Sequence, residues 1–389
     1  MPYTLTLPAA ALFTPRIHRG RACPAISPER GPVLLFSPAR FGALKLSNRV
    51  VMAPLTRVRA GASGVPNELL MEHYEQRAST GMIVTEGVYT SPESQAFAGQ
   101  PGIVTPEQVA GWRRVAEAVH AEGGLIVAQL MHGGRVTHPT VNGGREVVAP
   151  SAIPIDGFMR TADGLLPFPV PHALTTDELA GVITQFVSAA RNAIEAGLDG
   201  VEIHSANGYL LHEFLSPSSN TREDAYGGSP LNRVRFGIEL VTAVAREIGA
   251  DRVGLRISPS HNIQGVVEPD DAETRATYHE LMAGIAPLGL AYLSVLHPDP
   301  ACEFVQHLRQ RFAGPVIANS GFGVVTTREE AVAIVEDGHA DAVAIGRPII
   351  ANPDLVRRWV EDRELNDADR HTFYGPDARG YTDYPALAG

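Results

Sequence analysis

The residues most able to act together in chemistry are His204, Asn207 and Tyr209, which lie within six positions directly after a short, mostly apolar run at 200–203. An imidazole and a carboxamide offer N–H donors for an oxygen on which negative charge develops, and a phenol can give up a proton. Taken singly, each residue is explained at least as well by a role in a loop or helix cap. Joint chemistry therefore requires partners from the rest of the chain.

The elements around these residues alternate between strand and helix patterns along most of the chain. Strands are predicted at 49–53, 82–88, 125–130, 200–203, 252–258, 291–296, 315–319 and 341–345. Helices are predicted at 68–80, 106–121, 176–196, 231–248, 272–286, 303–312, 328–336 and 352–362. Eight strand–helix units favour an α/β fold of the (β/α)8 TIM-barrel type over an open doubly wound sheet. The sequence contains no GxGxxG or GxxxxGKS/T pattern, which removes the main nucleotide-binding alternatives.

Three segments depart from this alternation. A short hairpin with a turn near Gly42 is predicted before the first barrel strand. Residues 132–173, after the third strand, have no helical period, and a loop of this length is more often functional than idle, so we expect a lid over a site. Residues 1–34, rich in arginine, are predicted to be a dispensable or disordered extension, leaving 35–389 as one barrel domain.

Composition narrows the possible functions. With 32 basic and 43 acidic residues among 389, the net charge of -11 argues against a nucleic-acid surface and is ordinary for a cytoplasmic enzyme. No apolar run approaches the length of a membrane span, so no membrane partner is expected. Two isolated cysteines, Cys23 and Cys302, exclude a disulfide framework and a four-cysteine zinc or iron–sulfur site. No metal is expected, and redox chemistry would need an organic cofactor.

The ends of the last two strands suggest a phosphate site. Gly321 and Phe322 follow the seventh strand, and Gly346 and Arg347 follow the eighth. Glycine lets backbone N–H groups approach an oxyanion, and an arginine can bind two oxygens at once. Barrels often bind phosphate after these two strands. The alternative is a tight turn with a surface arginine.

Three polar residues in or directly after other strands suit a flavin ring. Arg256 lies within an apolar strand, where it needs either a carboxylate such as Glu202 or an electron-rich cofactor as its partner. Gln129, also in an apolar strand, offers the donor and acceptor that a ring imide requires. Thr56 either donates to a ring oxygen or caps a turn.

Long motifs in the same order resemble the Old Yellow Enzyme family of flavin-dependent ene reductases. They are MAPLTR at 52–57, HSANGYLLHEFLSPSSN at 204–220, TREDAYGGS at 221–229, AIGRPIIANPD at 344–354 and FYGPDARGYTDYP near the C-terminus. The resemblance covers about 35–385 and leaves the first 34 residues outside it.

The resemblance implies noncovalent FMN in the barrel, with NAD(P)H as the reductant. The residues expected to hold the flavin are Pro54, Leu55, Thr56, Gly87, Gln129 and Arg256, and those expected at the phosphate are Gly321, Phe322, Gly346 and Arg347. His204 and Asn207 match the family's oxygen-binding pair, and Tyr209 matches its proton donor. Tyr374 matches the aromatic residue at the substrate end of the flavin. The segment after Tyr209 is expected to hold this rim in place, and His212 is not expected to be a ligand.

Two residues depart from the family pattern in the expected substrate pocket. Met131 replaces a common tryptophan, and Phe97 stands where relatives often have a tyrosine. Both changes leave the flavin chemistry intact and bear on substrate preference.

The implied activity is reduction of the activated C=C bond of α,β-unsaturated carbonyl or nitro compounds by a ping-pong hydride transfer. Reduction of nitroesters or nitroaromatics at the same FMN site is the alternative, and a non-enzymatic flavin-binding protein is a third possibility. The expected partners are small activated alkenes and NAD(P)H, and the protein is expected to be a monomer or homodimer.

Overall fold

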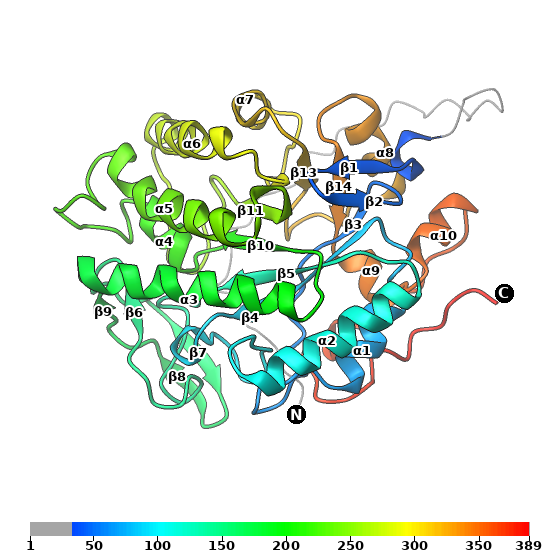
Figure 1. Cartoon of the computed structure of the whole chain (residues 1–389), viewed down its shortest axis with the longest axis horizontal. Coiled ribbons are helices and arrows are strands. Elements are labelled where there is room, and N and C mark those ends of the chain that lie inside the picture. Colours follow the sequence, from blue (N-terminus) through cyan, green and yellow to red (C-terminus); the bar gives the residue numbers. More distant parts are fainter. Residues whose placement is uncertain (1–32, 389) are drawn as a thin grey trace.

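The centre of the molecule is a closed barrel of eight parallel strands with helices around it (Figure 1). The computed structural model describes residues 33–388. The barrel strands are β3 (Val50–Met52), β4 (Met82–Tyr89), β5 (Ile126–Met131), β10 (Gly200–Ser205), β11 (Val253–Ile257), β12 (Tyr292–Leu296), β13 (Val316–Asn319) and β14 (Ala342–Ile345). Each strand pairs with the next one along the chain, and β14 closes the barrel against β3. The predicted (β/α)8 fold is confirmed, and the predicted strand bounds agree to within two residues.

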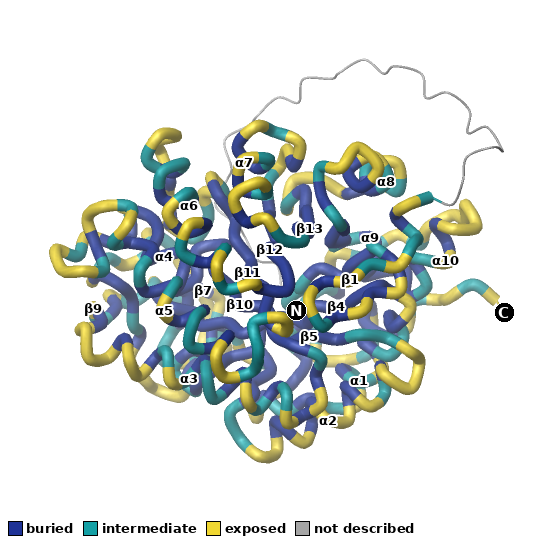
Figure 2. Tube along the Cα trace, turned by 45° about the horizontal axis from the view of Figure 1, so that its top comes forward, coloured by how far each residue is buried: buried dark blue, intermediate teal, exposed yellow. Residues whose placement is uncertain are grey.

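Two of the long helices begin at threonine N-caps. Thr105 and Thr175 precede α2 (Pro106–Ala121) and α3 (Thr176–Glu195), and each forms a capping box with the residue three positions later. The other helices are α1 (Glu68–Glu75), α4 (Leu210–Leu215), α5 (Pro230–Ile248), α6 (Asp271–Ile285), α7 (Glu303–Phe312), α8 (Arg328–Glu336), α9 (Arg347–Ala351) and α10 (Leu355–Val360). Figure 2 shows that the barrel strands are buried and that many exposed residues lie on the outer faces of the helices. Among residues 33–388, no helix is long and apolar enough to cross a membrane.

The first predicted helix is too long. The prediction ran to residue 80, whereas α1 ends at Glu75. Beyond that point the N–H groups of Arg77 and Ala78 bond to carbonyls three residues back, at Tyr74 and Glu75. These tighter turns end the α-helix before β4 begins.

The last predicted helix, 352–362, is also wrong in its bounds. The structure has α9 before Asn352 and α10 after it. Asn352 has φ −127° and ψ 87°, outside the helical region. It precedes Pro353, and a proline disfavours helical backbone in the residue before it. The proline therefore divides the segment into two helices.

The interior of the barrel changes from apolar to polar along the strands. Val127 of β5 belongs to an apolar cluster, whereas Gln129, on the same face of β5, lies opposite Glu202 of β10. His204, two residues after Glu202, lies opposite Arg256 of β11. The polar residues therefore gather toward the carboxyl ends of the strands, here called the barrel mouth, where barrel enzymes place their chemistry.

A hairpin lies at the opposite end of the barrel. Strands β1 (Ala39–Phe41) and β2 (Leu44–Leu46) pair antiparallel, with Gly42 at φ +58° in the turn. Phe41 lies in one apolar cluster with Tyr292 of the barrel interior, and their ring centroids are 6.4 Å apart. The hairpin therefore covers the amino-terminal end of the barrel. The extension expected at 1–34 lies outside the described residues, apart from the last two positions.

The insertion at 132–173 contains no helix but is not without regular structure. It includes β6 (Val148–Ala149), β7 (Phe158–Thr161), β8 (Gly164–Pro167) and β9 (His172–Ala173). Strands β7 and β8 form an antiparallel hairpin, and β6 pairs with β9. Val136 and Ile155 of the insertion pack in a cluster with Met131 and Tyr209, so the insertion forms part of the wall of the barrel mouth. Its role as a lid stays a prediction.

Candidate active site

His204 and Asn207 bring buried polar groups without protein partners to the barrel mouth. Their exposed fractions are 4% and 8%. Nδ1 of His204 and Oδ1 of Asn207 have no hydrogen-bond partner among the described residues. Burying a polar group without a partner is costly, so side chains in this state are suited to bind a polar ligand.

The electrostatic surroundings keep His204 neutral. Burial holds the pKa of His204 well below its usual value, and the positive charge of Arg256 adds to the effect. A neutral imidazole carries one N–H group and one acceptor nitrogen. His204 can therefore donate a hydrogen bond to an oxygen without bringing a full charge into the site.

Tyr209 stands beside this pair. Its ring is edge-on to the imidazole of His204, with centroids 4.9 Å apart and 70° between the planes. Phe97 contacts it from another direction, with centroids 6.4 Å apart. Burial raises the pKa of the Tyr209 phenol, although the side chain of Gln264 offsets part of the rise. The phenol therefore keeps its proton at neutral pH.

A sharp turn sets the spacing of the three predicted residues. Asn207 and Gly208 both have left-handed backbone, with φ of +57° and +82°. The N–H of Asn207 donates to Ser258 Oγ at 2.8 Å, which ties the turn to the end of β11. Helix α4 then begins directly after Tyr209. The structure thus brings together the oxygen-binding pair and the proton donor named from the sequence.

Arg256 has neutral partners from two neighbouring strands. Its guanidinium donates to Ser294 Oγ on β12 at 3.0 Å and to Asn319 Oδ1 on β13 at 3.3 Å. Its Nε has no partner among the described residues. Glu202, one of the two partners that the sequence left open, attracts Arg256 through its charge but forms no direct ion pair with it in the described chain.

Glu202 is instead the partner of Gln129. The amide Nε2 of Gln129 donates to Glu202 Oε1 at 2.8 Å, deep in the barrel. Burial raises the pKa of Glu202, although Arg256 and the hydrogen bond from Gln129 oppose that rise. The hydrogen bond fixes the orientation of the Gln129 amide, which directs its remaining polar atoms toward other partners.

The residues named for the phosphate converge at the ends of β13 and β14. Gly321 has left-handed backbone at φ +88°. Gly346 separates β14 from α9, and a side chain at that position would meet Leu55. The guanidinium of Arg347 donates to the carbonyl oxygen of Phe322, so the two loops are joined. Pro54, Leu55 and Thr56, all half-buried, follow the adjacent strand β3.

Gly87 and Met131 fit each other on adjacent strands. A Cβ atom at Gly87 would lie 2.7 Å from Sδ of Met131, which is too close unless the Met131 side chain or the backbone shifts. Met131 and Tyr209 lie in one cluster, with Phe97 packed against it. Phe97 and Met131, the two residues predicted for the substrate pocket, therefore lie beside the predicted proton donor.

The C-terminal segment 370–383 crosses to the barrel and is held by two buried arginines. Arg59 donates to the carbonyl oxygens of Thr372, Phe373, Asp377 and Arg379. Arg57 donates to the carbonyl oxygens of Phe373 and Gly380. Both guanidinium groups also lie over the ring of Tyr381, at 4.9 and 4.3 Å from its centroid. Tyr374 is part of this segment, so the two arginines hold the expected substrate-side aromatic residue.

Replacing Arg59 with methionine is expected to lower the free energy of unfolding by on the order of 3 kcal/mol or more, because several buried carbonyl groups lose their donor. Chemical denaturation of the FMN-loaded protein measures the change. Arg379→Met is the matched control from the same segment, since the Arg379 side chain is 76% exposed, and its effect should stay within about 0.5 kcal/mol. Equal losses in the two variants would contradict this account of Arg59.

Glu213 of α4 is a buried carboxyl group behind the active-site rim. Its Oε1 accepts the N–H of Arg135 at 2.9 Å, and its Oε2 has no partner among the described residues. Burial raises the pKa of Glu213 to about 8, despite the opposing charge of Arg135. Because the pKa is higher in the folded state than in the unfolded state, Glu213 favours folding at low pH and loses this contribution as the pH rises to about 8.

We therefore expect Glu213→Gln to gain stability relative to the parent protein as the pH rises from about 4.5 to about 8, since glutamine cannot ionise. Thermal unfolding midpoints of both proteins across this range provide the measurement. Glu178→Gln is a control of opposite sign, because hydrogen bonds from the Thr175 backbone and from His172 lower the pKa of Glu178 to about 2. That variant should lose stability at neutral pH. A pH-independent difference for Glu213→Gln would show that the group does not titrate as stated.

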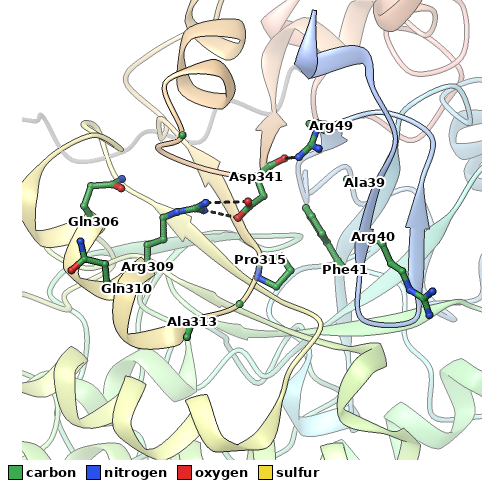
Figure 3. Close-up of a pocket in the computed structure, with 12 residues that line it drawn as sticks. Ala39, Arg40, Phe41, Arg49, Gln306, Arg309, Gln310, Ala313, Pro315 and Asp341 are labelled. Carbon is green, nitrogen blue, oxygen red and sulfur yellow. Dashed lines mark hydrogen bonds and ion pairs between the residues drawn. The ribbon is translucent and has the colours of Figure 1, made fainter.

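A cavity of about 590 Å³ opens at the opposite end of the barrel, beside the β1–β2 hairpin and α7 (Figure 3). Three of its charged residues interact with one another. Arg309 reaches both carboxylate oxygens of Asp341, and Arg49 donates to the carbonyl oxygen of the same residue. This cavity is at the amino-terminal end of the strands, away from His204 and Tyr209, and we do not assign the chemistry to it.

Sequence reasoning missed several residues of the site. Ser294 interrupts an apolar strand, the same signal that identified Gln129, and could have been found in that way. Gln264 gave no signal, because it lies in a loop without periodicity. Arg59 follows the MAPLTR motif by two positions, and its partners in the C-terminal segment lie more than 300 residues away in sequence.

Comparison with known proteins gives one consistent result. Residues 34–366 match the model of the NADH:flavin oxidoreductase / NADH oxidase family. A probable flavin mononucleotide-dependent alkene reductase of Leishmania infantum is 42% identical over 364 residues, which cover 91% of this chain and 98% of the relative.

Solved structures agree with the sequence match. A morphinone reductase in complex with tetrahydroNAD superposes with a TM-score of 0.85 at 44% identity, covering 91% of this chain and 98% of that one. An old yellow enzyme homologue from Zymomonas mobilis superposes with a TM-score of 0.86 at 40% identity, covering 91% and 99%.

Proposed function

Because the chain belongs to the NADH:flavin oxidoreductase / NADH oxidase family, we propose that it reduces the activated C=C bond of α,β-unsaturated carbonyl or nitro compounds. It is an FMN-dependent oxidoreductase of the Old Yellow Enzyme type, with a nicotinamide reductant. The observation that carries the proposal is the buried pair of His204 and Asn207, whose Nδ1 and Oδ1 have no hydrogen-bond partner within residues 33–388, with the protonated phenol of Tyr209 beside them.

The residues at the barrel mouth fit FMN. The Nε of Arg256, which has no partner in the described part of the chain, is a buried donor for an electron-rich ring, and Gln129 and Thr56 are suited to the polar edge of that ring. Gly321, Gly346 and Arg347, with the backbone of Phe322, would hold the phosphate, and Pro54, Leu55 and Gly87 would line the flavin. When bound, FMN supplies the hydride-transfer chemistry that amino-acid side chains lack.

The side chains of the site would then act on the alkene. His204 and Asn207 donate hydrogen bonds to the carbonyl or nitro oxygen, which draws negative charge away from the C=C bond and leaves its β-carbon electron-poor. Such donors are typically worth about 2.7–4 kcal/mol each in a transition state. Tyr209 gives its proton to the α-carbon, and the raised pKa of its phenol ensures that this proton is present at neutral pH.

One pocket that serves both NAD(P)H and the alkene predicts ping-pong kinetics. Initial rates with NADPH and 2-cyclohexenone varied together should give parallel double-reciprocal lines, with cyclohexanone as the product. Nitrobenzene assayed in parallel tests the alternative, since a nitro group presents two oxygens to the same donors. Reduction of nitrobenzene without any cyclohexanone would favour the nitro-reductase function and contradict the proposal.

A further inference from the structure

The peptide unit between Asn207 and Gly208 is held at both of its polar ends. Its carbonyl oxygen accepts a hydrogen bond from Gln264 Nε2 at 2.5 Å. Its N–H group donates to Nδ1 of His212 at 3.0 Å. This peptide lies between Asn207, proposed to donate a hydrogen bond to the substrate oxygen, and Tyr209, the proposed proton donor. Its orientation therefore sets the position of both side chains.

His212 is built into the protein in one tautomer. The side chain is fully buried on α4. A backbone N–H can only donate, so Nδ1 of His212 must carry a lone pair, and the ring proton of the neutral form lies on Nε2. Nε2 lies 3.4 Å from Glu268 Oε1 and 3.3 Å from the hydroxyl of Tyr278. Glu268 and Tyr278 thus fix the ring so that Nδ1 faces the turn.

The loop between β11 and α6 supplies the other half of the clamp. Glu268 Oε2 accepts the N–H of Ser260 at 2.6 Å, and Asn262 Oδ1 accepts the N–H of Glu268 at 2.8 Å. A Cβ atom at Gly208 would lie 2.7 Å from the carbonyl oxygen of Ile263, so the loop rests directly on the turn. Gln264 itself has left-handed backbone, at φ +55°. The loop geometry therefore brings its amide to the carbonyl of Asn207.

We propose that His212 and Gln264 form a peptide clamp that sets the distance and angle between the oxygen-binding pair and Tyr209. His212 is a positioning residue. Its side chain accepts a hydrogen bond from the turn, and among the described residues it forms no hydrogen bond with His204 or Tyr209. The inference rests on the proposed function for the roles of Asn207 and Tyr209. The clamp itself is a property of the folded protein and is tested without turnover.

Two substitutions at His212 distinguish a positioning role, through its hydrogen bond to Gly208, from a role in packing alone. Asparagine places a carbonyl oxygen near the position of Nδ1 and so keeps an acceptor for Gly208. Glutamine places its amide near Nε2, which keeps a donor for Glu268 but removes the acceptor. Both variants retain a polar side chain in the buried site, and both are first checked for FMN content and unfolding temperature.

The first measurement is amide hydrogen exchange at Gly208 in the FMN-loaded protein. We expect His212→Gln to accelerate exchange by about 10-fold, the change that corresponds to one lost hydrogen bond, and His212→Asn to preserve the protection. The second is spectral titration with 4-cyanophenol, whose oxygen would bind His204 and Asn207. Its affinity should fall by about 10-fold or more in His212→Gln and recover in His212→Asn, since small displacements at a site have effects of this size.

Gln264→Ala tests the other end of the peptide and is expected to weaken 4-cyanophenol binding while leaving FMN bound. Unchanged protection of Gly208 in His212→Gln, or equal losses in the glutamine and asparagine variants, would overturn the clamp. So would faster exchange with unchanged phenol affinity, because the turn would then be loosened without moving the donors. A parent protein that binds the phenol but does not reduce an enone would instead contradict the proposed function, while the hydrogen-exchange comparison would still support the clamp.

Discussion

Tyr209→Phe is expected to slow alkene reduction by about 10²–10⁴-fold, the usual contribution of a positioned general acid. Reduction of the flavin by NAD(P)H should be nearly unchanged, because that step requires no proton for the alkene. The phenylalanine keeps the edge-on packing with His204 and Phe97, so the pocket should retain its shape. Stopped-flow absorbance measures the two half-reactions separately.

The raised pKa of Tyr209 adds a second observable to this prediction. Since the phenol stays protonated through the neutral range, the alkene half-reaction of the parent protein should show no loss of rate between about pH 6 and 9 from this group. Equal slowing of both half-reactions by Tyr209→Phe would remove Tyr209 as the proton donor.

The double substitution His204→Ala with Asn207→Ala is expected to abolish measurable binding of phenols and enones while FMN is retained. Removal of one such donor costs about 10²–10³-fold in rate, so loss of both should leave little alkene reduction. We expect FMN to be retained because the residues proposed to hold it are others, namely Arg256, Gln129 and the loops after β13 and β14. Absorbance spectra of the purified variant and titration with 4-cyanophenol measure the two properties.

The single variants provide the control for this result. Each retains one donor and should retain weakened phenol binding, with the parent spectrum of bound FMN. Purification of the double variant as apoprotein would contradict the assignment and would point to a structural role for the pair in holding the cofactor site.

The fold and the proposed reacting residues could be predicted from the sequence because the patterns that indicate them lie within short segments. Alternating strand and helix patterns specified the barrel to within two residues at each strand. His204, Asn207 and Tyr209 lie within six positions at the end of one strand, so the turn alone brings them together. The resemblance to a known family added the cofactor, which no single motif specified.

The partners of Arg256 could not be derived in the same way. Ser294 and Asn319 come from two other strands, and their contacts depend on how the strands are staggered in the closed barrel. The same stagger places Glu202 opposite Gln129 rather than in direct contact with Arg256. A sequence pattern gives the face of each strand but not the register between strands.

The contacts around the turn at Asn207 and Gly208 could not be predicted from the sequence for a different reason. Gln264 reaches Asn207 only because its loop adopts left-handed backbone at two non-glycine positions, Ser260 and Gln264. Such conformations are uncommon for these residue types and are imposed by tertiary contacts. The peptide clamp thus became apparent only when the β11–α6 loop was placed in three dimensions.

In the proposed reaction, hydride passes from NAD(P)H to an activated alkene through FMN bound at the barrel mouth. The most direct test is the absorption spectrum of the purified protein under anaerobic conditions, before and after NADPH and then after 2-cyclohexenone. We predict a flavin spectrum that NADPH bleaches and that 2-cyclohexenone restores. A yellow protein whose flavin NADPH does not bleach, or a bleached flavin that the enone cannot reoxidise, would contradict the account.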